Sequence, residues 1–145
     1  MAFVTRDGKV LLIKRAENPK DPWSGQIAMP GGRVEPGETC EQAAVREALE
    51  EVGKTPENLV FIGMFQPLNR PVIVYAYMSC SEQFEPKINQ EEVSEAFWFS
   101  LDLVKGNEKQ IKFENHVIWG MTLRILKEIK SKRLYEKCQK GNDSS

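Results

Sequence analysis

Several patterns that would assign a chain to a large protein class are scarce or missing here. The 145 residues include one histidine, His116, and three cysteines without a CxxC pair, which excludes the clustered ligands of a zinc site. No apolar run approaches the roughly 18 residues of a membrane-spanning helix. The opening stretch MAFVTRDGK has no extended apolar region of the kind found in signal peptides. The sequence therefore predicts neither a zinc protein nor a membrane partner.

An excess of charge of one sign is also missing. The formal net charge is −1, which gives no general electrostatic attraction to nucleic acid, so none is expected as a partner. Residues 127–140 are richer in lysine and arginine, but they include Glu128 and Glu136. Because cations are favoured at a helix C-terminus, we interpret this stretch as a solvated helix end rather than a phosphate site.

The number and spacing of the cysteines indicate the cellular compartment. Cys40, Cys80 and Cys138 are an odd number and lie far apart in the sequence, which fits a reduced, cytoplasmic setting. Cys40 has no obvious base beside it, so we expect it to be inert.

Length and composition are those of one globular domain. The chain is 41% hydrophobic and 28% charged, and 145 residues are enough to bury a core of their own. We expect residues 1–137 to form the domain and residues 138–145 to form a flexible C-terminal tail.

Apolar periodicity and turn residues predict strands and helices that alternate along the chain. The predicted elements are a hairpin over 3–15 with its turn at Asp7-Gly8, a loop over 17–31, a helix after Thr39, strands at 59–65, 72–80 and 97–101, and a helix over 116–137. Mixed elements of this kind predict an α/β protein, specifically an α/β/α sandwich around a mixed sheet.

The last predicted helix has an apolar stripe, and two tryptophans look like core residues. The stripe consists of Ile118, Met121, Thr122, Ile125 and Ile129. Trp98 and Trp119 are both expected to be buried.

The most informative stretch is GRVEPGETCEQAAVREALEEVG, residues 32–53. Glu47, Glu50 and Glu51 are spaced i, i+3, i+4, so on a helix their side chains lie on one face. Three carboxylates crowded together repel each other and destabilise the helix unless a positive group lies among them. A hard divalent cation, which prefers oxygen ligands, would satisfy them.

Capping residues support a helix at this position. Thr39 is a plausible N-cap and Gln42 completes a capping box, while Gly53 suits the C-terminal end. The predicted apolar face, opposite the glutamates, consists of Val45, Ala48, Leu49 and Val52.

These residues carry a family resemblance. The segment resembles the Nudix box, the signature of hydrolases of nucleoside diphosphates linked to another group. The seven fixed positions that match are Gly32, Glu38, Arg46, Glu47, Glu50, Glu51 and Gly53. Lys54 departs from the apolar residue that usually closes the motif, at a position that concerns packing. The resemblance implies the Nudix-type α/β/α sandwich and a metal-dependent pyrophosphohydrolase.

Metal ligands are implied by the resemblance. Glu47, Glu50 and Glu51 match the metal-binding carboxylates, and the backbone carbonyl of Gly32 would be a further ligand. The expected cofactor is Mg²⁺ or Mn²⁺, which can neutralise a diphosphate and acidify a bound water.

The same resemblance implies roles for the neighbouring residues. Arg46 would hold a glutamate in position by a charge-assisted pair, and Glu38 is a possible partner for it. Gly31 and Gly32 would let the loop approach the diphosphate of the substrate.

The general base stays open, because family members differ in which residue serves. Glu50 and Glu51 lie deepest in the motif, but a glutamate in a downstream loop can also serve. Glu91 and Glu92 are candidates for that role, and a merely solvated loop is the alternative interpretation.

A narrower resemblance concerns the substrate. The segments that are similar to the coenzyme A pyrophosphatase branch are Leu11 to Ala16, Lys20, Gly25 and Met29 to Gly32. There are three departures from that branch. Lys20 replaces an arginine, one extra residue precedes Gly25, and Met29 stands where phenylalanine is usual.

That branch implies substrate-binding roles for Arg15 and Lys20. The 3′-phosphate of coenzyme A suits a forked guanidinium, although Arg15 could also be the exposed end of an edge strand. Trp23 could stack on a base or pantetheine, or simply pack.

Several functions stay open. Coenzyme A or an acyl-coenzyme A would give 3′,5′-ADP and a phosphopantetheine. Other candidate substrates are dinucleotides, ADP-ribose, nucleotide sugars and damaged nucleoside triphosphates. A sensor that binds a nucleotide without hydrolysing it is a different class, but sensors usually lose a metal glutamate and this chain keeps all three. Near-neutral charge disfavours RNA cap removal. Many family members form dimers, so the resemblance allows a homodimer.

Overall fold

A computed structural model describes residues 1–68 and 70–140 of the chain. Its elements in chain order are β1 (Ala2–Val4), β2 (Lys9–Arg15), β3 (Ile27–Ala28), α1 (Cys40–Val52), β4 (Val60–Phe65), β5 (Val74–Cys80), β6 (Val93–Ser100), the 3₁₀ turn η1 (Leu101–Leu103), β7 (Gln110–Phe113), β8 (His116–Trp119), α2 (Gly120–Ser131) and α3 (Glu136–Lys140).

A mixed six-stranded sheet organises the fold. Its hydrogen-bonded order is β3-β2-β1-β5-β4, and β6 pairs with β2. Only β1 and β5 are parallel; the other pairs are antiparallel. The predicted first hairpin is confirmed. Gly8 adopts a positive φ of 79°, and its N–H donates to the Thr5 carbonyl at 3.1 Å.

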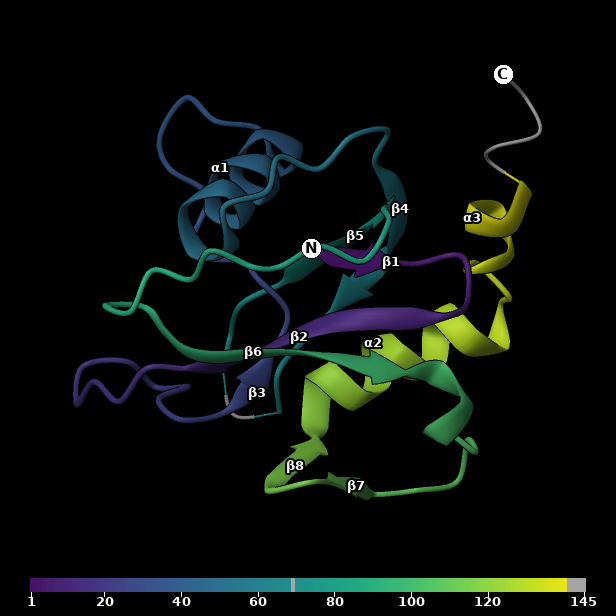
Figure 1. Cartoon of the computed structure of the whole chain (residues 1–145). Helices are drawn as coiled ribbons and strands as arrows, with labels where there is room; N and C mark the ends of the chain where they lie inside the picture. Colours follow the sequence, from purple (N-terminus) through teal and green to yellow (C-terminus); the bar gives the residue numbers. More distant parts are fainter. Residues whose placement is uncertain (69, 141–145) are drawn as a thin grey trace.

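Each face of the sheet packs against a helix, so β2 is apolar on both sides. Leu11 and Ile13 belong to a buried cluster that includes Ala48 of α1. Their neighbour Leu12 points to the other cluster, which contains Leu126 of α2. Figure 1 shows α1 and α2 on opposite sides of the sheet. The predicted α/β/α sandwich is confirmed.

The prediction of one helix over 116–137 is wrong at its start. His116 and Ile118 are buried while Val117 and Trp119 are exposed, which is the period of two of a strand. These residues form β8, which pairs with β7 in a separate two-stranded sheet, and α2 begins only at Gly120.

The two tryptophans expected in the core differ. Trp119 is 48% exposed, so its prediction as a core residue is wrong. Trp98 is partly buried against the α1-side cluster, and its indole N–H donates to the Phe84 carbonyl at 3.2 Å. The α2 stripe is confirmed at its buried positions Thr122, Ile125 and Ile129.

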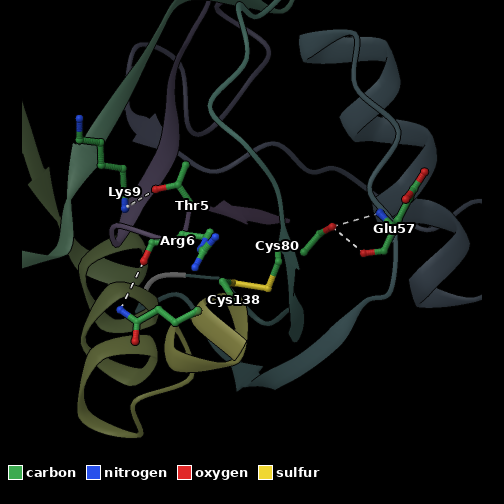
Figure 2. Close-up of a disulfide and its surroundings, with 8 residues drawn as sticks. Thr5, Arg6, Lys9, Glu57, Cys80 and Cys138 are labelled. Atoms are coloured by element: carbon green, nitrogen blue, oxygen red, sulfur yellow. Dashed lines mark hydrogen bonds between the residues drawn. A yellow bond between two sulfur atoms is a disulfide. The ribbon is translucent and has the colours of Figure 1, made fainter. Parts of the chain in front are cut away.

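The C-terminus is tied to the sheet by a disulfide that the sequence did not predict. Cys80, at the end of β5, is bonded to Cys138, which is buried in α3, and their Cα atoms are 5.1 Å apart. Figure 2 shows this bond beside the Arg6 carbonyl, which accepts from the Gln139 amide at 3.3 Å. The expected flexible tail began at residue 138, but residues 138–140 belong to α3. Residues 141–145 of that tail lie outside the described residues.

The length and apolar content of the helices bear on the prediction that the chain has no membrane-spanning helix. Within residues 1–68 and 70–140, none of the helices has the length and apolar content needed to cross a membrane.

Candidate metal centre

Helix α1 begins and ends where the sequence predicts. The Thr39 hydroxyl accepts from the Gln42 N–H, and the Gln42 side chain accepts from the Thr39 N–H, forming the expected capping box. Gly53 ends the helix with a φ of 73°, and its N–H donates to the Leu49 carbonyl at 3.0 Å. These two ends fix the orientation of the glutamates between them.

The glutamates do not share one environment. Ala48 and Val52 are buried as predicted, but Leu49 is 51% exposed and Glu51 only 2% exposed. The reason is helical spacing, because Glu51 follows Ala44 and Ala48 along the stripe that faces the sheet. The prediction of a buried Leu49 opposite an exposed glutamate face is therefore wrong for Leu49 and Glu51.

Glu51 holds the glycine loop that precedes the helix. The Gly31 N–H donates to its Oε1 at 3.0 Å. Burial, reinforced by the neighbouring Glu47 carboxylate, raises the pKa of Glu51 to about 8. The Gly31 hydrogen bond and the charge of Arg15 act in the opposite direction and do not cancel the rise.

Three other carboxylates converge beside it. One oxygen from each of Glu47, Glu50 and Glu92 lies within 4.8 Å of the other two. Glu92 directly precedes β6, and its carbonyl accepts from the Ala16 N–H at 2.9 Å, just past the end of β2. Burial and the charges of Glu47 and Glu50 raise the pKa of Glu92. Of the two downstream candidates, the structure brings Glu92 into the cluster, whereas Glu91 stays outside it.

Close approach of the loop to Glu47 requires glycine at position 32. A Cβ atom on Gly32 would lie 2.6 Å from the Glu47 carboxyl carbon, closer than side-chain contacts allow. Gly31 has no such constraint, since the nearest atom to its would-be Cβ is the Met29 carbonyl oxygen at 4.0 Å. The glycine pair therefore brings backbone against the carboxylates of α1.

Arg46 connects the carboxylates. Its guanidinium donates to both oxygens of Glu38, at 2.6 and 3.0 Å, and to Glu47 at 2.7 Å, with Glu50 at 3.5 Å. The hydrogen bond from Arg46 holds the pKa of Glu38 below its usual value. The predicted pairing of Arg46 with Glu38 and a motif glutamate is confirmed.

Arg15 and Lys20, the basic residues upstream of the motif, differ in their surroundings. Arg15 ends β2, and its Nε donates to the Asp21 carboxylate at 2.8 Å. The sequence missed this pair, because a loop contact between residues six apart has no periodic signal. Lys20 is exposed in the loop that follows β2.

The donor set fits a hard divalent cation. Glu47, Glu50 and Glu92 offer carboxylate oxygens, and such ligands suit Mg²⁺ and Mn²⁺. Without a cation, Arg46 relieves part of their mutual repulsion through its contacts with Glu47 and Glu50.

The sequence and the fold match a known family. A family model of the NUDIX domain covers residues 1–117. This chain belongs to the Nudix family. Nudix hydrolases generally use divalent metal ions, in agreement with the carboxylate cluster. The resemblance noted from the sequence is thus confirmed for the family, but not for the coenzyme A branch.

Individual relatives show how far the similarity extends. An ADP-ribose pyrophosphatase from Methanocaldococcus jannaschii is 45% identical over 68 residues, covering 47% of this chain and 38% of that protein. An oxidized purine nucleoside triphosphate hydrolase from Danio rerio is 31% identical over 82% of this chain and 74% of that protein. The crystal structure of a MutT NUDIX hydrolase from Burkholderia pseudomallei has a TM-score of 0.66 at 26% identity, covering 88% of this chain and 92% of that chain. The chain spans about half or less of the first curated relatives it matches.

Proposed function

We propose that this Nudix chain hydrolyses a diphosphate linkage in a nucleoside diphosphate derivative with the help of Mg²⁺ or Mn²⁺, and that residues 1–137 form the hydrolase domain. The observation that carries the proposal is the convergence of the Glu47, Glu50 and Glu92 carboxylates beside the Gly31-Gly32 loop.

These groups divide into metal ligands and supporting residues. Glu47, Glu50 and the Gly32 carbonyl would hold the cation, which when bound would neutralise the diphosphate and acidify a water molecule. Glu51 was predicted as a third carboxylate ligand. Its Oε1 already accepts from Gly31, so its role as a ligand stays a prediction, and a bound cation would have to keep it ionised.

The chain itself supplies positioning and proton transfer. Arg46 orients Glu47 and Glu50 through its hydrogen bond and ion pair. Glu92 is our choice of general base, because it reaches Glu47 and Glu50 from the turn before β6 and its pKa is raised by burial and by their charges. Proton transfer of this kind is worth about 10²–10⁴-fold in rate. Glu50 and Glu51 remain the alternative bases.

Within this reaction we favour coenzyme A or an acyl-coenzyme A, cleaved to 3′,5′-ADP and a phosphopantetheine. Support comes from the upstream sequence resemblance and from Arg15, which lies at the end of β2 close enough to lower the pKa of Glu92. Asp21 engages its Nε, and this leaves the two terminal nitrogens of the fork to face a 3′-phosphate. Lys20 in the following loop is exposed and could contact the same phosphate.

The named relatives favour a second substrate class. The Methanocaldococcus jannaschii protein is named an ADP-ribose pyrophosphatase, and the Danio rerio protein an oxidized purine nucleoside triphosphate hydrolase. ADP-ribose and oxidised nucleoside triphosphates are therefore the alternatives. A non-catalytic sensor has less support, because all the carboxylates of the motif are retained.

Location and partners follow from the proposed substrate. We propose a cytoplasmic protein with a small-molecule substrate and no nucleic-acid partner, and a homodimer stays open. The Cys80–Cys138 bond is uncommon for that compartment. Its redox state in cells therefore tests the location.

The first test is a turnover panel with Mg²⁺ or Mn²⁺, containing coenzyme A, an acyl-coenzyme A, ADP-ribose and an oxidised nucleoside triphosphate, with products identified by mass. Release of 3′,5′-ADP from coenzyme A would establish the favoured substrate. Turnover of another member alone would keep the hydrolase and reject coenzyme A. Metal-independent binding without turnover would reject hydrolysis in favour of a sensor.

Arg15→Ala tests the assignment to coenzyme A. It should raise KM for coenzyme A more than for dephospho-coenzyme A, which lacks the 3′-phosphate. Equal effects on the two compounds would remove the proposed role of Arg15.

A further inference from the structure

Two loops at one end of the sheet contact each other through an arginine and a tryptophan. The Arg70 guanidinium lies over the Trp23 ring, 5.8 Å from its centroid, within the range of a cation–π contact. Trp23 belongs to the loop between β2 and β3, and Arg70 to the connection between β4 and β5. Their sequence separation gives no hint of this contact.

Sheet topology places this pair at the same end of the sheet as the cluster. β2 and β4 are both antiparallel to the parallel pair β1 and β5, so their C-terminal ends lie at one end of the sheet. β6 is antiparallel to β2, so it begins at that end. Glu92 precedes β6, Arg15 ends β2 and Arg70 follows β4, and all three therefore lie at this end.

Asp21 joins the tryptophan–arginine pair to Arg15. One oxygen of its carboxylate accepts from the Arg15 Nε at 2.8 Å, and the other accepts from the Trp23 backbone N–H at 3.0 Å. The path from Glu92 through Arg15 and Asp21 to Trp23 and Arg70 is thus continuous. It extends away from the carboxylates by several side chains, in keeping with a nucleotide that reaches outward from its diphosphate.

The charge of Arg70 is the second relevant observation. Within residues 1–68 and 70–140, no carboxylate forms an ion pair with its guanidinium, although Arg15 and Arg46 are both paired. Arg70 is exposed, so its planar guanidinium is accessible to a ligand beside the indole ring. Bases stack on planar guanidinium groups, and stacking tolerates any base because each has a π-face.

We propose that the Trp23–Arg70 pair is the subsite for the nucleobase of the substrate, with the base lying on the guanidinium. Asp21 is a positioning residue that fixes Trp23 and Arg15 together, so that the base and the neighbouring phosphate are recognised by adjacent groups. This subsite rests on the proposed function, because it requires that the bound molecule is a nucleotide. Every substrate in the turnover panel contains a base, so the subsite does not depend on which one is preferred.

Binding of ADP, compared with inorganic pyrophosphate, tests the subsite, since only ADP has a base. Trp23→Ala and Arg70→Ala should each weaken ADP binding on the order of 10- to 100-fold and leave pyrophosphate binding unchanged. Arg70→Lys keeps the positive charge but lacks the planar guanidinium, so its ADP affinity should be as low as that of Arg70→Ala. The matched controls are Trp119→Phe at the exposed end of β8 and Arg6→Ala near α3, and both should bind ADP normally.

Indole N–H signals in a nitrogen–proton NMR spectrum give a readout independent of turnover and show whether each variant is folded. ADP should shift the Trp23 signal, assigned by its loss in Trp23→Phe, and leave the Trp119 signal in place. Unchanged ADP affinity in folded Trp23→Ala and Arg70→Ala would overturn the subsite even if the wild-type chain turned over the panel. A wild-type chain that turned over nothing, but shifted Trp23 with ADP, would overturn the proposed function and support the subsite.

Discussion

At the scale of single residues, the carboxylates of one motif make different contacts because the helix places them in different surroundings. Glu47 approaches Gly32 and Glu50 joins the exposed carboxylate cluster, whereas Glu51 is buried and holds Gly31. Glu92 completes the cluster from the turn before β6. Helical spacing placed Glu47, Glu50 and Glu51 on one face, but that prediction missed the packing of Glu51 against the sheet.

Glu92→Gln tests the choice of general base. Removing the proton acceptor should lower kcat by about 10²–10⁴-fold with little change in the fold. Glu91→Gln is the matched control, because its side chain lies outside the cluster, and its kcat should be near that of the wild type. Steady-state kinetics on the preferred substrate measure both. A normal kcat in Glu92→Gln would return the role of base to Glu50 or Glu51.

Glu51 makes the metal-free protein sensitive to pH. Its pKa is raised from 4.5 to about 8, so between these values the unfolded state ionises while the folded state keeps the proton. Stability should therefore fall as pH rises from about 4.5 to about 8. The Glu51→Gln variant lacks this loss of stability. In EDTA, the difference between its melting temperature and that of the wild type should therefore increase as pH rises, in favour of the variant.

Thermal unfolding at pH 5, 6.5 and 8 measures that difference. Glu85→Gln is the control, because Glu85 is exposed and lies outside the carboxylate cluster, and its curve should run parallel to the wild type. Parallel curves for Glu51→Gln as well would show that Glu51 is ionised in the fold.

At the scale of elements, α1 and the loop before it form one unit. The Arg46 guanidinium donates to the Arg33 carbonyl at 3.0 Å, and the Gly31 N–H donates to Glu51, so the first half of the loop is bonded to the helix at two positions. The capping residues made this helix predictable. The neighbouring loop conformation was not, because it depends on contacts across the helix surface.

Gly32→Ala tests this unit. The added methyl group would push the Glu47 carboxylate away, so Mn²⁺ affinity should fall about 10- to 100-fold. Gly31→Ala is the matched control, because its methyl group would meet no close atom. Calorimetric titration with Mn²⁺ measures both variants. Equal affinities in the two would mean that Glu47 does not bind the cation in this position.

Element prediction failed where a strand and a helix are contiguous. Residues 116–119 alternate between buried and exposed, but four residues are too few to distinguish this period from the helical stripe that follows. Gly120, with a φ of 59°, separates the two elements. β7 and β8 form a local hairpin across Glu114 and Asn115, but strands of four residues each are too short to be told from a helix by periodicity alone.

At the scale of the whole molecule, the two ends of the sheet are specialised. The C-terminal ends of β2 and β4 carry the candidate site. β5 runs the opposite way, so Cys80 and its bond to Cys138 lie at the other end. Figure 1 likewise shows α3 far from the segment that enters β6. The apolar patterns predicted the layers, but a bond across 58 residues has no local signal.

Reduction of that bond should therefore lower stability and leave catalysis intact. Closing a loop of 58 residues restricts the unfolded chain, which predicts a loss of about 2–4 kcal/mol on reduction, or roughly 5–15 °C in Tm. Dithiothreitol and Cys138→Ser should give the same decrease, and Cys40→Ser, which keeps the bond, should give none. Since α3 and the carboxylates lie at opposite ends of the sheet, kcat and KM measured well below the reduced Tm should not change. A parallel loss of turnover would instead mean that α3 and the candidate site are coupled through the strands of the sheet that lie between them.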